Sequence, residues 1–477
     1  MLATTYVPSP GWLNAGDTSW QLTAATLVGL MSLPGIAVLY GGIVKKKWAV
    51  NTMVMAFAAF SLVLIVWVLW AYNMGFGPGL LHIGSAARGT FLGKPGPILG
   101  ATHEIGPASI PQTSDLAGPS LMFSSSALVY FQFVFAAITP LLFLGSVLGR
   151  MSLKAWLIFV PLWTTFAYTV NAMLLWGGGF WAQRGALDYS GGYVIHLAAG
   201  TSGFVAAAVV GPRLKRDRDS FTPNNLLLVA AGAGILWLGW NGFNGGDPYF
   251  ANGDAAAAVL NTNLATAAAL LTWLTMDTFG GPKKPNFLGS VNGMIVGLVA
   301  ITPAAGFVNG WGALMMGIIA SAIVWFSWNK MAHVGIFKKV DDALGVVHTH
   351  GVAGLAGGIL VGFFADPKMA EYYVKGANGK LSVVSSAGLF YGHPGQVAIQ
   401  AGAALTVIVW DALVTFLILK LIEKVFRISL RFTDEELEIG DAAVHLEEVM
   451  PPEGARRIGE GYEGVDAGRP ALEGSPA

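Results

Sequence analysis

The chain alternates between long apolar stretches and short polar connections. An apolar run of about 17 to 25 residues is long enough to cross the hydrocarbon core of a bilayer as a helix. Such runs lie near 20–42, 49–75, 120–148, 153–177, 188–211, 224–245, 254–276, 286–304, 308–329, 343–365 and 396–423. The pattern predicts an all-α polytopic membrane protein with eleven transmembrane helices.

One spaced pattern occurs twice in the chain. Its first copy is Asp188, Gly191, His196, Ala199, Gly200 and Gly203, and its second is Asp342, Gly345, His350, Ala353, Gly354 and Gly357. Each copy opens an apolar run, and eight residues of α-helix span roughly 12 Å, so each histidine should lie near mid-bilayer. Ionisable residues at that depth are costly and usually functional.

Basic residues gather in alternate connections, as at Lys45 to Lys47 and Arg213 to Arg218. The positive-inside rule therefore predicts an external N-terminus and a cytosolic C-terminus. Spans one to five (20–211) and six to ten (224–365) then have opposite orientations and form an inverted 5+5 repeat, and 396–423 is one extra helix. In this arrangement the two histidines should meet in the middle.

The amino-acid composition supports a membrane protein and excludes several other classes of function. Hydrophobic residues make up 54% of the 477 and charged residues only 11%, far below the roughly 25% of soluble domains. The net charge of +0 gives no global attraction to nucleic acid. Because the chain has 0 cysteines, disulfides, thiolate metal ligands and a cysteine nucleophile are excluded.

We expect two regions, a transmembrane domain over 1–431 and a cytosolic tail over 432–477. Within the first, the Gly-, Pro- and Ser-rich connection at 76–119 should form an external cap rather than a domain. The tail begins with acidic residues after Arg431, and from 451 onward it lacks apolar periodicity, so its distal part should be disordered.

A pair of neutral imidazoles at His196 and His350 could line a passage with weak donors and acceptors suited to ammonia or water. Alternatively, each histidine could simply bond a backbone carbonyl between packed helices, but the duplicated context favours the pore. Haem or metal binding is a further alternative. It would need more histidines along the helices, and His348 lies on nearly the opposite helix face from His350, so no cofactor or metal is expected.

A second group of candidates gathers at the external side. Trp176 ends span four, where the face of its ring could hold a small cation by cation–π attraction worth about 0.5 to 2 kcal/mol. Alternatively, it could belong to the belt of aromatic residues that is common at the membrane interface. Asp188 could cap the following helix and also favour a cation through its field. Asp247 lies on the same external side, and its alternative role is that of an ordinary turn residue. Phe135 and Phe243 could equally face lipid or the core.

The stretch DYSGGYVIH from Asp188 and the stretch HTHGVAGLAGG from His348 resemble signatures of the Amt/Mep/Rh ammonium transporter family, and the match runs from about Pro34 through Gly440. GFNGGDPY and HTHGVAG are more similar to the Mep-like branch, which includes some plant members. The resemblance implies a homotrimer in a cell membrane, plasma or inner, with one pore in each protomer.

The resemblance also implies roles for individual residues. His196 and His350 correspond to the twin pore histidines, Phe135 to the outer phenylalanine of a gate, and Phe243 to the phenylalanine stacked below it. The implied transport starts with external ammonium, which loses its proton near the gate and crosses as ammonia. Whether the proton follows along the histidines or returns outside stays open.

Trp176 corresponds to the cation-facing tryptophan of the external recruitment site, with Tyr168 as a supporting residue, and Asp188 to the family's acidic residue. Asp247 stands where the best-known bacterial members have a serine. An inward-pointing Asp247 should make external cation affinity stronger and more pH-dependent.

The expected function is therefore ammonium transport and not enzyme catalysis, with ammonium, ammonia or methylammonium as substrate. The alternative is an ammonium sensor that signals through its tail; a redox enzyme is the least favoured. The segment FTDEELEIGDAAVHLEE resembles the family's tail motif, which implies coupling to the pore and docking of a PII-type regulator.

Overall fold

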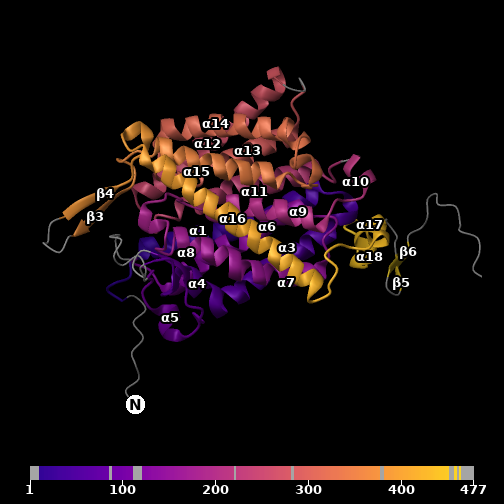
Figure 1. Cartoon of the computed structure of the whole chain (residues 1–477), viewed down its shortest axis with the longest axis horizontal. Coiled ribbons are helices and arrows are strands. Elements are labelled where there is room, and N and C mark those ends of the chain that lie inside the picture. Colours follow the sequence, from indigo (N-terminus) through magenta and orange to yellow (C-terminus); the bar gives the residue numbers. More distant parts are fainter. Residues whose placement is uncertain are drawn as a thin grey trace, which may run out of the picture.

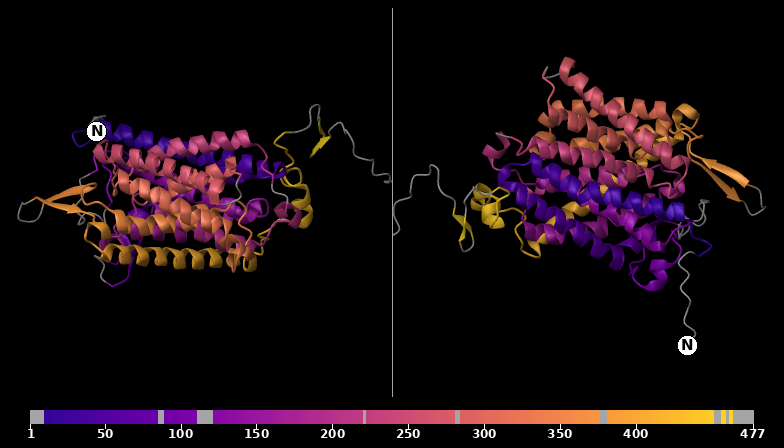
Figure 2. Two further views of the ribbon diagram at one scale, coloured as in Figure 1. Left: turned by 90° about the horizontal axis from the view of Figure 1, so that it is seen from above. Right: turned by 180° about the vertical axis from the view of Figure 1, so that it is seen from behind.

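The computed structural model describes residues 10–84, 89–110, 121–219, 222–280, 284–375, 381–450, 456–458 and 461–463. Within them, ten helical segments are long and apolar enough to cross a membrane, and Phe287–Ile301 is a shorter apolar helix. The helices run side by side along one axis as a single bundle (Figures 1 and 2). The expected all-helical membrane fold is confirmed.

The first half of the bundle contains five spans. Its α-helices are α1 (Ala15–Leu30), α2 (Ile36–Ile43), α3 (Ala49–Val66), α4 (Tyr72–Phe76), α6 (Ser125–Val147), α7 (Leu153–Trp163), α8 (Thr169–Leu175) and α9 (Ala198–Val210). Helices α1 and α2 form one span, α3 and α4 a second, and α7 and α8 another.

The second half repeats this organisation. Its helices are α11 (Leu226–Gly245), α12 (Gly253–Thr275), α13 (Phe287–Ile301), α14 (Gly310–Asn329) and α15 (Ala353–Phe364). The extra helix α16 (Gly395–Lys424) follows and lies along the outside of the bundle (Figure 1).

Wide π-turns lie within several spans or at their ends. They are η1 (Met31–Gly35), η3 (Trp67–Ala71), η5 (Thr164–Tyr168), η7 (Gly192–Leu197), η8 (Met276–Gly280) and η11 (Val347–Val352). Pro34 lies inside η1, where a proline cannot donate the backbone hydrogen bond of a regular helix. Turns of this kind are frequent at functional sites, and η7 and η11 carry the two duplicated histidines.

The duplicated pattern has the same local structure in both halves. Gly191 and Gly345 precede the two π-turns with φ of 107° and 75°, a left-handed conformation that favours glycine. Just beyond, the two histidine-bearing segments cross at glycines, since a methyl group on Gly200 would lie 2.2 Å from Cα of Gly351. This close crossing sets the histidines of the two halves side by side.

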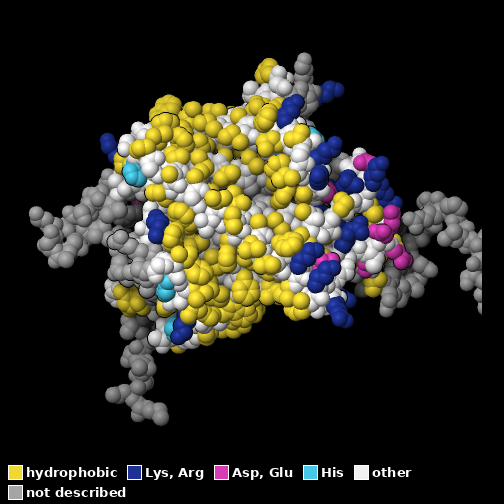
Figure 3. Space-filling view, in the orientation of Figure 1, with side chains coloured by type: hydrophobic (Ala, Val, Ile, Leu, Met, Phe, Trp, Pro, Cys, Tyr) yellow, Lys and Arg dark blue, Asp and Glu magenta, His cyan; other side chains and the backbone are white. Residues whose placement is uncertain are grey.

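The surface has a broad apolar zone bounded by charged ends. Figure 3 shows hydrophobic side chains across the middle of one face, and Lys, Arg, Asp and Glu gathered at the end that carries α10 (Lys215–Asp219) and the tail. Large apolar side chains of the spanning helices are exposed, including Leu238 at 65%, Leu405 at 62% and Trp311 at 80%. Such a zone is suited to lipid contact, and the basic end corresponds to the cytosolic side.

The external connections contain small elements that the apolar pattern did not predict. The expected cap holds a hairpin of β1 (Gly79–His82) and β2 (Thr90–Gly93), followed by α5 (Ala101–Ile105). A second hairpin, β3 (Glu371–Lys375) with β4 (Leu381–Ser385), precedes α16. Residues 85–88 and 111–120 of the cap lie outside the described residues.

Short helices fill the remaining connections and the tail. The 3₁₀ turns are η2 (Lys46–Trp48), η6 (Ala182–Arg184), η9 (Met331–His333), η10 (Phe337–Lys339) and η12 (Leu389–Tyr391), and the tail helices are α17 (Asp434–Ile439) and α18 (Asp441–Val444). Of the stretch from 451 onward, only β5 (Arg456–Ile458) and β6 (Gly461–Glu463) are described, and they pair as a hairpin. The expected disorder otherwise falls outside the described residues.

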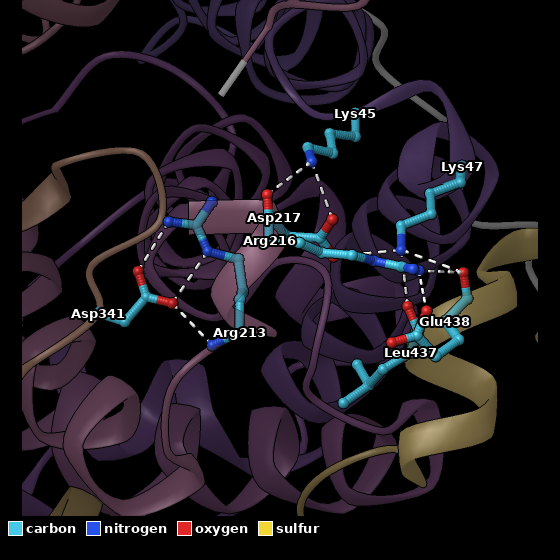
Figure 4. A network of polar contacts seen from close by, with 8 residues as sticks. All are labelled: Lys45, Lys47, Arg213, Arg216, Asp217, Asp341, Leu437 and Glu438. Carbon is cyan, nitrogen blue, oxygen red and sulfur yellow. Dashed lines mark hydrogen bonds and ion pairs between the residues drawn. The ribbon is translucent and has the colours of Figure 1, made fainter. Parts of the chain in front are cut away.

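The tail packs against the cytosolic ends of the first half (Figure 4). Lys47 Nζ donates to the carbonyl of Leu437 at 2.7 Å, and Arg216 forms an ion pair with Glu438. Lys45 and Lys47 in turn pair with Asp217 at 2.9 and 3.1 Å. The tail therefore bridges two cytosolic connections of its own chain.

Candidate functional site

The two duplicated histidines meet at the centre of the bundle. Nδ1 of His350 lies 3.2 Å from Nδ1 of His196, and the two rings stack with their centroids 5.3 Å apart. His196 is 0% exposed and His350 is 4% exposed. A neutral pair can make this bond with one Nδ1 donating and the other accepting. The sequence pattern alone predicted this meeting of distant residues.

A line of aromatic rings continues from His196 towards the external side. Phe243 of α11 lies with its ring centroid 5.9 Å from that of His196, and Phe135 of α6 stacks on Phe243 at 4.3 Å. Trp176, directly after α8, then meets Phe135 edge-on at 6.0 Å. Five predicted site residues thus form one unbroken sequence of ring contacts.

Trp240 forms a wall beside this line. Its ring stacks on His196 with centroids 5.4 Å apart, and its indole N–H donates to the Thr302 hydroxyl at 2.9 Å. The sequence gives Trp240 no separate role, because aromatic residues are common along apolar helices. Its spacing of three residues from Phe243 was the available signal, since both lie on one face of α11.

Asp188 is fixed at the start of η7. Its Oδ2 accepts from the backbone N–H groups of Tyr193 at 3.1 Å and Val194 at 3.0 Å, as a helix-capping carboxylate does. Its backbone carbonyl accepts from the Trp176 indole at 2.6 Å. Oδ1 is buried and has no hydrogen-bond partner among the described residues. Asp188 therefore positions Trp176 and keeps one free carboxylate oxygen.

Asp247 points inward and contacts Ser190. The Ser190 hydroxyl lies in a short hydrogen bond with Asp247 Oδ2 and is also 3.1 Å from the carbonyl of Phe243. Burial raises the pKa of Asp247 well above its usual range, the Ser190 hydrogen bond opposes that rise, and the charge of Asp188 adds to it. Ser190 was not singled out from the sequence, because the fold alone joins it to a residue 57 positions away.

Tyr168 does not join the ring line in the described contacts. Its ring centroid lies 5.9 Å from that of Trp67 and 6.4 Å from that of Trp163, and its buried hydroxyl has no hydrogen-bond partner among the described residues. It packs behind the site.

No group of three or more His, Cys, Asp or Glu able to hold a metal ion occurs in the part of the chain that the structure describes.

Residues 19–450 match the family model described as "Ammonium Transporter Family". The chain belongs to the ammonium transporter family. This transporter is 51% identical over 448 residues to "Ammonium transporter 3 member 2" of Oryza sativa subsp. japonica, covering 92% of this chain and 90% of the relative. It is 50% identical over 457 residues to "Ammonium transporter 2" of Arabidopsis thaliana, covering 94% and 91%.

Solved structures agree with the transporter's fold. The crystal structure of Saccharomyces cerevisiae Mep2 superposes with a TM-score of 0.73 at 28% identity, covering 89% of each chain. Candida albicans Mep2 gives 0.73 at 29% identity, covering 90% of this chain and 89% of that one. A structure titled "Sensor Amt Protein" is 23% identical with a TM-score of 0.72 and shows the fold alone. The expected resemblance to the Mep-like branch is confirmed.

Proposed function

We propose that this transporter collects external ammonium in an aromatic and acidic vestibule, removes its proton at a phenylalanine gate and conducts ammonia past the histidine pair. The observation that carries the proposal is the continuous line of rings from Trp176 through Phe135 and Phe243 to His196 and His350. The membrane would be a cell membrane, plasma or inner, and methylammonium is a further candidate substrate.

The vestibule chemistry supports recruitment of a small cation. The face of Trp176 offers cation–π attraction, worth about 0.5 to 2 kcal/mol as the site becomes dry. The unpartnered Oδ1 of Asp188 and the inward carboxyl of Asp247 add acceptors or negative charge beside it. These groups would replace part of the hydration of ammonium before it reaches the gate.

Below the gate, the passage suits a neutral molecule. Phe135 and Phe243 are both 0% exposed and stacked, so a full charge between them would lose its hydration without compensation. Ammonia needs only single hydrogen bonds, which the imidazole nitrogens supply. K⁺ and Na⁺ cannot shed their charge, and this difference gives the proposed selectivity.

The assembly and regulation are also proposals. Family resemblance supports a homotrimer, for which exposed apolar side chains such as Trp311 on α14 and Leu260 on α12 are available. The native mass of the purified protein should be three times that of one chain. The folded tail supports regulation of the pore and offers a surface for a PII-type protein, and it favours these roles over signalling as an independent sensor.

The decisive test is an ammonium concentration jump on proteoliposomes attached to a solid-supported membrane. We expect either a transient current that ammonium evokes and K⁺ does not, or alkalinisation of the lumen without current if only ammonia crosses. The His196→Ala and His350→Ala variants should lose transport or lose discrimination against K⁺. His393→Ala, which changes an exposed histidine outside the spans, is the matched control. Unchanged flux and selectivity in both pore variants would contradict the proposal.

A further inference from the structure

The inverted repeat copies the surroundings of the external site at the opposite, cytosolic end. Asp342 Oδ2 accepts from the backbone N–H of Val347 at 2.8 Å, as Asp188 Oδ2 accepts from that of Tyr193. Both carboxylates precede a left-handed glycine and a π-turn. In both, Oδ1 is buried and has no hydrogen-bond partner among the described residues. The second half therefore also keeps a free carboxylate oxygen.

A tryptophan accompanies the second carboxylate as it does the first. Trp176 directly follows α8, the last helix of span four, and Trp328 is the last residue but one of α14 in span nine. Trp328 lines a cavity of about 380 Å³ together with Phe337, Asp342 and His348. The ring centroid of His348 lies 5.8 Å from that of Trp328 and 6.0 Å from that of Phe337. The three rings and the carboxylate thus line one cavity at the cytosolic end.

His348 has a fixed place in this cavity. It is 6% exposed, and its Nδ1 lies 2.8 Å from the hydroxyl of Ser327 on α14. The hydrogen bond leaves the Nε2 side of the ring for other partners. His348 lies two residues before His350, so the cavity adjoins the segment that holds the pore pair.

The cation that lines the cavity is already paired. Arg213 donates to Asp341 from its backbone N–H at 2.8 Å, from Nε at 3.0 Å and from Nη2 at 2.7 Å (Figure 4). Charge-assisted bonds of this bidentate kind neutralise both partners. Asp342 is therefore the carboxylate in the lining that forms no ion pair among the described residues, and the buried guanidinium of Arg150 acts on its charge only from a distance.

We propose that this cavity is a second ammonium-binding site, on the cytosolic face, formed by Trp328, Asp342 and His348. An aromatic face beside a partly buried carboxylate is the arrangement that attracts small monovalent cations. The inference rests on the proposed function, because ammonia that leaves the pore takes up a proton and becomes the ligand of this site. The transporter then binds ammonium at both ends of its passage, and cytosolic ammonium saturates the site from within.

The test compares the two faces of the transporter. Proteoliposomes of sorted orientation receive ammonium jumps on the external or the cytosolic face, and the half-saturation concentration is measured for each. A lost ground-state contact raises the half-saturation value for the face that carries it. We expect Asp342→Asn and Trp328→Leu to raise the cytosolic value about three-fold or more and to leave the external value unchanged.

Matched variants make this comparison selective. Trp328→Phe keeps an aromatic face and should stay near the wild type, and Phe57→Leu, at an exposed apolar position of α3, should change neither value. Trp176→Leu should show the mirror result, with only the external value raised. If transport persists and the cytosolic value is the same in Asp342→Asn, Trp328→Leu and the wild type, the cytosolic site is refuted and the proposed function stands.

A binding measurement covers the case in which the variants, or the wild type, do not transport. Saturation-transfer NMR of tetramethylammonium with purified Trp176→Leu protein reports binding away from the external site. We expect transfer to the methyl protons, and its loss when Asp342→Asn is added. Absence of transfer in Trp176→Leu, or equal transfer in both proteins, would overturn the cytosolic site independently of any transport result.

Discussion

His196 and His350 face each other through the same ring nitrogen. With Nδ1 opposite Nδ1 at 3.2 Å, one ring donates and the other accepts, so the remaining Nε2 atoms of the pair differ. The donating ring has an Nε2 that accepts, and the accepting ring has an Nε2–H that donates. Ammonia, which can both donate and accept, can bond to either end. Exchange of the two tautomers moves one proton along the pair without charging both rings.

Asp247 is the residue whose titration should be visible in transport. Burial raises its pKa, so Asp247 takes up a proton at a higher pH than an exposed carboxyl does. Lowering the external pH should therefore protonate Asp247, remove its charge and raise the external half-saturation concentration for ammonium. Ammonium itself stays protonated as the pH falls. Asp247→Asn should already show the raised value at neutral pH and vary less with pH.

The control for this experiment is Asp254→Asn, which changes a carboxylate at the external start of α12 outside the ring line. It should behave as the wild type. A pH profile that is the same in Asp247→Asn and the wild type would show that the Ser190 bond has a structural role only. The structure suits either protonation state. A protonated Asp247 donates to Ser190 while Ser190 donates to the Phe243 carbonyl, and an ionised one accepts from Ser190.

The sequence predicted those site residues that belong to the internal repeat or to a family signature. His196 and His350 follow from the duplicated spacing, and both are buried in contact. Ser190 and Ser327 did not follow, because each acts through a partner brought close by the fold alone. Ser327 lies 21 residues from His348, and no local periodicity connects them.

The close crossing of α9 and η11 explains why glycine recurs in both copies of the duplicated histidine pattern. A methyl group on Gly200 would lie 2.2 Å from Cα of Gly351, and one on Gly354 would lie 2.6 Å from the carbonyl oxygen of Gly192. Neither backbone neighbour can move aside as a flexible side chain could. Small residues thus allow the two segments to approach until the imidazoles touch.

We predict that Gly200→Ala separates the histidine-bearing segments. The added methyl group should cost about 1 to 3 kcal/mol, as overpacking in a close-packed interior does. It should lower the melting temperature of the purified protein and reduce ammonium flux strongly. Gly234→Ala on α11 is the matched control, since a methyl group there meets nothing within 4 Å. Equal melting temperatures and fluxes for the two variants would show that the crossing tolerates a wider separation.

The sequence predicted the helices better than their irregularities. Apolar length alone located the spans, because a bilayer requires a minimum run of apolar residues. The π-turns η7 and η11 have no compositional mark of their own, and the hairpin of β1 and β2 lies in a connection where hydropathy carries no information. Packing between helices, rather than local preference, determines such features.

The tail docks on the cytosolic start of α3, which packs against α6, the helix that carries Phe135. Asp441 accepts from the backbone N–H groups of Val50 at 2.7 Å and Asn51 at 2.9 Å, and so caps the start of α3. Farther along α3, Phe60 packs edge-on against Phe133 of α6 with centroids 4.9 Å apart. Phe133 lies two residues from Phe135. A change in tail docking can therefore shift the gate through the position of α3.

We predict that Asp441→Ala slows transport without changing the external half-saturation concentration, because the vestibule residues are untouched. Loss of a cap costs about 0.5 to 2 kcal/mol, so the tail should also be cleaved faster in limited proteolysis.

Asp434→Ala is the control, since that carboxylate is 81% exposed and pairs only locally with Arg431 among the described residues. Faster cleavage with an unchanged transport rate would show that the tail docks without acting on the gate. A slower rate together with faster cleavage would support coupling, and a double-mutant cycle with Phe60→Ala would then show whether it runs through the contact of α3 with α6.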